Sequence, residues 1–243
     1  MYQTKYDGIA AVNFIKNYPA TKDLKISLAG HSAGAYAAIL VSEACDVKNV
    51  LAMSSFDSPR EAAWSLMDEK IGGFRYLLFP FLDLTMTIGG KDNYVKASEV
   101  IDRNPDKTYF LMHCSYDTFV PYETASLIRK YNTPTFDYRS YEMFHHDGIP
   151  EFIPEYYEIQ HKDNVYSQLI TWSTHSDTWL SYDSQAYTMQ YFWWPIGYDV
   201  ENNNPEKLKM MDYIAKYGHG RVDKDKTTEM NTYALSKVVE LFK

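Results

Sequence analysis

The residues of this sequence best suited to chemistry lie in a short stretch, GHSAG, at positions 30–34. Before it, residues 24–30 form an apolar, partly β-branched run that is typical of a buried strand. After it, residues 32–45 are rich in small side chains and predict a helix. A serine between two glycines at such a strand-to-helix turn is typical of a catalytic nucleophile held in a strained backbone conformation. We therefore expect Ser32 to be a nucleophile.

The neighbours of this serine fit the same interpretation. Gly30 and Gly34 have no side chains, so the helix can pack tightly on the strand. The backbone N–H of Ala33 would face the oxyanion that forms when the serine attacks a carbonyl group. The amino end of the helix adds partial positive charge at that place. His31 is expected to have a packing role.

A serine hydroxyl is a weak nucleophile near neutral pH, so it needs a base that a carboxylate orients. Residues 107–117 predict a strand that ends in a polar loop at Asp117. Residues 135–148 predict the next strand, which ends at His145 and His146. Because the carboxyl ends of parallel strands meet at one edge of a sheet, these groups are expected near the serine, with Asp117 as the acid and His146 as the base.

Other histidines compete for the role of base. His145 is adjacent to His146 in the same loop, and His219 lies in the glycine-rich stretch KYGHGR. His219 follows a helical segment rather than a strand, so the strand-end position favours His146. His113 falls within a predicted strand and is expected to be a core or strand-end residue.

Three segments together resemble the α/β-hydrolase superfamily: GHSAG, HCSYDTFVP and YEMFHHDG. They are similar to its serine turn, to its H-G-x-x-D-x-x-V-P segment and to its terminal strand with the histidine loop. The resemblance is to the serine esterase and serine aminopeptidase branch, and it is good over residues 6–148. It implies a triad of Ser32, Asp117 and His146, with His145 at a position that is usually glycine, and a reaction that needs no cofactor.

Helices and strands alternate along this part of the chain, with helices expected at 6–19 and 120–132 and a further strand at 47–56. Such alternation predicts an α/β fold with a parallel sheet flanked by helices. The superfamily normally has four strands before the serine, whereas here the serine strand begins at residue 24. The resemblance therefore implies that the N-terminal strands are missing from this sequence. They would belong to a longer form of the same chain or be supplied by another chain. The serine strand would then be an exposed edge.

The chain is predicted to divide into a hydrolase core at residues 1–150 and a C-terminal elaboration at 151–243. Within the core, residues 57–105 are expected to form a lid insertion. Residues 166–198 are dense in Trp and Tyr and are expected to pack a further layer or an interface, rather than to line a sugar or aryl subsite. The last segment, 227–243, predicts an amphipathic closing helix.

Composition limits the partners. The net charge of −8 argues against nucleic acid or an anionic membrane surface as the main partner. The most apolar run, 74–90, contains Arg75, Asp83 and a proline, so no membrane span is expected. Two cysteines, Cys45 and Cys114, are too few for a disulfide framework, which favours a reduced compartment such as the cytoplasm.

The sequence therefore predicts a serine hydrolase that cleaves a carboxylic ester, or an amide, through an acyl-serine intermediate. Its partner would be a small-molecule ester or peptide substrate. Two alternatives remain: a serine peptidase that acts on small peptides with the same triad, and an inactive hydrolase-like fragment or binding module. No metal is expected, because the ligand spacing of zinc sites is lacking in the nearest cluster, which comprises His145, His146, His161 and Asp163.

Overall fold

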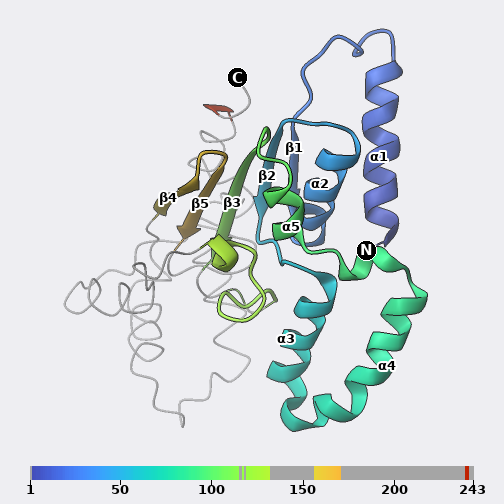
Figure 1. Cartoon of the computed structure of the whole chain (residues 1–243), viewed down its shortest axis with the longest axis vertical. Helices are drawn as coiled ribbons and strands as arrows, with labels where there is room; N and C mark the ends of the chain where they lie inside the picture. Colours follow the sequence, from blue (N-terminus) through green and yellow to red (C-terminus); the bar gives the residue numbers. More distant parts are fainter. Residues whose placement is uncertain (1, 115–116, 118, 132–155, 171–238, 241–243) are drawn as a thin grey trace, which may run out of the picture.

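The computed structural model describes residues 2–114, 117, 119–131, 156–170 and 239–240. Within them, five strands form one sheet in the order β1-β2-β3-β5-β4. The strands β1 (Leu28–His31), β2 (Asn49–Met53), β3 (Thr108–Cys114) and β5 (Val165–Ile170) run parallel, and β4 (Tyr156–Lys162) is antiparallel to β5. The predicted α/β architecture is thus confirmed as a parallel sheet of four strands flanked by helices (Figure 1), and one antiparallel strand extends it.

The inner strands β2 and β3 are buried on both faces, which explains why they appear in the sequence as continuous apolar runs, whereas β1 at the side of the sheet has no buried residue. One face packs against α2 (Ala33–Ala44) and α5 (Ala97–Asp102) through a core that includes Ile39, Val100, Val50, Tyr109 and Leu111. The alternate side chains of the same strands form a second buried cluster, with Leu51, Phe110, Met112 and Cys114. This alternation follows from the two-residue period of a strand.

The first helix, α1 (Tyr2–Asn17), covers the predicted segment 6–19 and packs on the outer side of α2. The contact is a small apolar cluster in which Val12 meets Val41 and Cys45. At the end of α1, Lys16 Nζ donates a hydrogen bond to the Cys45 carbonyl at 2.5 Å. Helix α2, which follows Ser32 directly, is therefore held from both sides, by the sheet and by α1.

The predicted insertion 57–105 consists of helices. It contains α3 (Pro59–Ile71), the 3₁₀ turn η1 (Gly72–Phe74), α4 (Arg75–Ile88), the 3₁₀ turn η2 (Lys91–Tyr94) and α5. Figure 1 shows α3 and α4 projecting beyond the end of the sheet at which β3 and β5 terminate. Among the described helices, none has the length and apolar character that crossing a membrane requires.

The prediction of a helix at 120–132 is wrong, because over the described residues 120–131 the only helical element is η3 (Ile128–Tyr131), a 3₁₀ turn. The preceding backbone forms one local turn, in which the N–H groups of Thr124, Ala125 and Ser126 donate to Pro121 O, and then pairs with the segment after β2. Leu127 N donates to Ser55 O at 2.9 Å, and Asp57 N donates to Ala125 O at 3.3 Å. Tertiary pairing has overridden the local preference for helix, since these groups cannot also bond within a helix.

The sheet position beside β3 is occupied by a strand that sequence reasoning did not find. The next strand that we expected along the chain, at 135–148, lies outside the described residues. Strand β5 pairs with β3, and a hairpin joins β5 to β4. Lys162 pairs with Val165, which leaves Asp163 and Asn164 as the turn. The aromatic segment 166–198 is described only up to residue 170, and the closing helix 227–243 only at 239–240, where the chain is helical.

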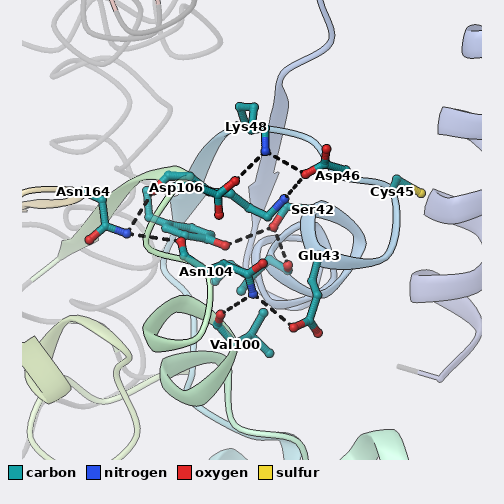
Figure 2. A network of polar contacts seen from close by, with 12 residues as sticks. Ser42, Glu43, Cys45, Asp46, Lys48, Val100, Asn104, Asp106 and Asn164 are labelled. Carbon is teal, nitrogen blue, oxygen red and sulfur yellow. Dashed lines mark hydrogen bonds and ion pairs between the residues drawn. The ribbon is translucent and has the colours of Figure 1, made fainter.

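A polar network fixes the amino ends of β2 and β3 (Figure 2). Asp46 Oδ1 accepts from the buried Lys107 Nζ at 2.7 Å and from Lys48 Nζ at 2.9 Å, and Lys48 also reaches Asp106 Oδ2 at 2.5 Å. Hydrogen bonds from Lys107 and then Lys48 lower the pKa of Asp46 to about 2. Asn164 Nδ2 donates to Lys107 O at 3.0 Å, so the hairpin turn is attached to the same network.

Candidate active site

Ser32 stands at the junction of β1 and α2 in a conformation that few side chains adopt. Its backbone has φ 55° and ψ −122°, in the region that favours glycine. Ser32 N donates to Met53 O at 2.8 Å, which continues the pairing of β1 with β2 by one residue. Its carbonyl accepts from Ala35 N at 3.0 Å and so begins α2. The strained serine is thus held by a strand on one side and a helix on the other.

The two glycines beside the serine have different roles. A Cβ on Gly30 would lie 2.3 Å from Gly34 O and 2.7 Å from Ala35 N, so the first turn of α2 packs directly on the Gly30 backbone. A Cβ on Gly34 would meet nothing within 4 Å. The expectation that a missing side chain is needed for tight packing is therefore correct for Gly30 and wrong for Gly34.

Ala33 is the first residue of α2, and the N–H groups of a first helical turn have no acceptor within their own helix. It is the residue that follows Ser32 in the chain, where an oxyanion donor is expected. The positive end of the helix dipole lies at the same place. The role of the Ala33 N–H as an oxyanion donor stays a prediction.

Asp117 follows β3 and its side chain is fully buried. Its Oδ1 atom accepts hydrogen bonds from Phe119 N at 2.9 Å and Val120 N at 2.7 Å. These bonds orient the carboxylate by the backbone of its own loop. In the sheet order, the strands that precede Ser32 and Asp117 are separated only by β2, and both residues follow the carboxyl ends of their strands.

His113 contributes a contact to this loop that the sequence did not reveal. It is buried, as predicted for a strand-end histidine, but its Nε2 lies 2.9 Å from Val120 O and 3.7 Å from Asp117 Oδ2. A carbonyl oxygen only accepts, so Nε2 carries the proton in the contact with Val120. His113, Val120 and Asp117 therefore brace one another. The signal available in the sequence was the four-residue spacing H-C-S-Y-D across the end of a strand.

A second buried carboxylate, Asp57, lies after β2 and was not singled out from the sequence. Its Oδ1 accepts from Ser98 N at 2.8 Å, in the first turn of α5, and its Oδ2 is 3.6 Å from Lys130 Nζ. These contacts connect the end of β2 to α5 and to η3. They give Asp57 a structural role in aligning the elements around the site.

The predicted bases lie outside the described residues: His145, His146 and His219. His31 is half-buried. The described part of the chain therefore places Ser32, Ala33 and Asp117 after the carboxyl ends of two parallel strands, β1 and β3. Their roles as nucleophile, oxyanion donor and acid stay predictions. Among the described residues, no three His, Cys, Asp or Glu side chains cluster closely enough to hold a metal ion.

A cavity of about 460 Å³ opens between α3, α4 and the loop after Asp117. Its walls are mostly aromatic and apolar and include two charged residues. The lining residues are Arg60, Glu61, Trp64, Tyr76, Phe79, Pro80 and Thr124. The Trp64 and Phe79 rings meet edge to face with centroids 4.3 Å apart. Arg60 lies over the Phe79 ring and pairs with Asp83, with Nε and Oδ1 2.8 Å apart.

Known proteins resemble this chain only distantly. No protein-family model matches it, and no curated protein matches it. Among solved structures, it is similar to two crystal forms of the esterase Pf2001 from Pyrococcus furiosus, with 16% and 20% sequence identity and TM-scores of 0.40 and 0.41. Each match covers 87% of this chain and 61% of the esterase chain. The chain spans about three fifths of the length of the esterase that it matches.

Proposed function

We propose that this chain belongs to the α/β-hydrolase superfamily and hydrolyses carboxylic esters through an acyl-serine intermediate. The observation that carries the proposal is the backbone of Ser32, a non-glycine residue with φ 55° held between a strand and a helix whose first turn packs on Gly30. Such strain persists only where the surrounding structure imposes it, and it is concentrated at functional sites. The buried Asp117 at the same sheet edge supports the assignment.

In the proposed reaction, Ser32 Oγ attacks the ester carbonyl carbon while His146 takes the hydroxyl proton. The negative charge that develops on the carbonyl oxygen is stabilised by the Ala33 N–H at the amino end of α2. Collapse of the tetrahedral intermediate breaks the bond to the alcohol, which leaves with the proton from His146. Water then attacks the acyl-serine with His146 again as the base, and the acid is released. Asp117 holds the imidazole and stabilises its charged form.

The α3–α4 pair is proposed to act as the lid of this site, with its aromatic cavity receiving the acyl or alcohol group of the substrate. Four of the seven lining residues are aromatic or proline, which favours an apolar group. Replacing Trp64 by alanine is expected to raise KM for aryl or long-chain esters and to leave KM for acetyl esters nearly unchanged. Steady-state kinetics on an acyl-length series measures this difference.

The central test is covalent labelling with a fluorophosphonate probe, followed by mass mapping of the labelled peptide. We expect one adduct on Ser32, none in Ser32→Ala, and unchanged labelling in the matched control Ser98→Ala. Parallel variants His145→Ala, His146→Ala and His219→Ala identify the base, and only His146→Ala should abolish labelling. Asp117→Asn should slow labelling by about 10³–10⁴-fold.

Different outcomes decide between the candidate functions. Turnover of short acyl esters in preference to aminoacyl anilides supports the esterase, and the reverse order indicates a peptidase with the same triad. A folded chain that neither labels at Ser32 nor turns over either substrate class contradicts the proposal and indicates a binding module.

A further inference from the structure

Helix α4 carries an apolar stripe on its outer side. The stripe consists of six apolar residues, one just before the helix and five within it: Phe74, Leu77, Leu78, Phe81, Leu84 and Ile88. The exposed fractions of these residues range from 48% to 77%. Their spacing of three, four, seven, ten and fourteen residues from Phe74 places them on one side of a helix. We call this set the α4 stripe.

The stripe faces away from α3, the other helix of the α3–α4 pair. The inner side of α4 is occupied by contacts with α3, namely Phe79 against Trp64 and Asp83 with Arg60. At 100° per residue, those inner positions lie opposite the centre of the stripe. Figure 1 shows α4 as the outer helix of the pair. The exposed apolar residues are therefore not a second packing face toward α3.

The stripe contains no charged residue. The charged residues of α4, Arg75 and Asp83, project to its other sides by their helical positions. Thr85 falls within the stripe, but its hydroxyl donates to Leu82 O at 2.7 Å and is satisfied by its own helix. A symmetric interface places like residues opposite one another, so an uncharged face allows a chain of net charge −8 to associate with itself without local repulsion.

The area of the stripe is enough for such an interface. With about 170 Å² for a fully exposed side chain of this size, the six exposures amount to about 650 Å² per chain. Two copies would then bury about 1,300 Å², within the range of about 1,200–2,000 Å² for specific protein interfaces. An exposed apolar patch above a few hundred Å² is also uncommon on a monomer.

We propose that the α4 stripe is the interface of a homodimer, in which the α4 helices of two copies pack antiparallel about a two-fold axis near Phe81. An antiparallel pair of identical helices matches each end of the stripe with the opposite end of its copy, and Phe81 at the middle meets its own equivalent. The interface joins the α3–α4 pair of one copy to that of the other. It does not depend on the esterase assignment, since it rests on the surface of α4 alone.

Sedimentation velocity across a range of protein concentrations tests the proposal. We expect a reversible dimer, and a Leu77→Glu, Leu84→Glu double variant should raise the dissociation constant by at least about 100-fold. The matched control is Leu24→Glu, because Leu24 is 62% exposed and Leu77 is 66% exposed but only Leu77 belongs to the stripe. The control should dimerise like the wild type, and circular dichroism should show that all variants are folded.

A crosslinking experiment locates the axis. Phe81→Cys should form a covalent dimer under mild oxidation, whereas Leu24→Cys should not, and the native Cys45 and Cys114 are buried. A wild-type monomer at all concentrations overturns the proposal, and so does a dimer that the double variant does not weaken. A monomer that floats with phosphatidylcholine vesicles, and loses this in the double variant, also overturns it and identifies a lipid surface as the partner of the stripe.

Discussion

The two glycines that flank Ser32 allow a sharp test, because they are four residues apart in one motif and differ in their surroundings. A methyl group on Gly30 would be placed 2.3 Å from Gly34 O and 2.5 Å from Gly34 C, whereas carbon contacts normally begin at about 3.5 Å. The atoms in the way are backbone, so they cannot move by a change of rotamer. Gly30→Ala must therefore displace the first turn of α2 by about 1 Å.

We expect Gly30→Ala to lower the free energy of unfolding by about 3 kcal/mol, the upper end of the usual cost of overpacking. Gly34→Ala should instead raise it by about 0.5–1 kcal/mol, because nothing obstructs the methyl group and alanine loses less backbone entropy in a helix. Urea denaturation followed by tryptophan fluorescence measures both values. With a slope of about 2–3 kcal/mol/M, the two midpoints should differ by more than about 1 M.

The reasoning is refuted if the two variants have the same midpoint, or if Gly34→Ala is the less stable of the pair. Either result would mean that α2 does not pack on the backbone of Gly30. The strained turn at Ser32 would then lack the support that the proposed function requires.

Three further predictions concern strain, charge and capping. Ser32→Gly should abolish probe labelling but stabilise the fold by about 1 kcal/mol in urea denaturation, because glycine adopts φ 55° without strain. The folded-state pKa of Asp46, about 2, is below its unfolded value, so the contribution of Asp46 to stability is present above about pH 4 and is lost as the pH falls through 2. The stability of the Asp46→Asn variant should therefore fall less steeply than that of the wild type between pH 5 and pH 2, as measured by thermal unfolding. Ser58→Ala should cost about 1 kcal/mol, because Ser58 Oγ accepts from Glu61 N at 3.2 Å in the first turn of α3, and an equal loss in Ser98→Ala would contradict this cause.

The sequence predicted best those parts of the fold in which local pattern and tertiary structure agree. The elements around Ser32 were expected near their observed places because an apolar strand, a glycine and a run of small residues all indicate the same turn. Residues 107–117 were predicted as a strand, and β3 spans Thr108–Cys114. In each case the signal lies within about ten residues.

The prediction failed where a distant partner decides the local structure. Residues 120–132 have a helical pattern, but Leu127 and Ala125 pair with the segment after β2, and no pattern within the stretch reveals that partner. The contact of His113 with Asp117 depends on how the loop after β3 turns back. The hairpin of β4 and β5 has a local signal in its two turn residues, Asp163 and Asn164, but β5 overlaps the aromatic stretch 166–198, which has no clean periodicity.

The order of strands also has a consequence for how the chain reaches its native state. The β4–β5 hairpin closes through a two-residue turn and can form on its own within microseconds. Its attachment to β3 joins Tyr109 to Val165, a contact between residues far apart in the chain, so the loop entropy of that step must be overcome late. Until then the edge of β3 is without its partner strand and can pair with another molecule. Refolding yield should therefore fall as protein concentration rises.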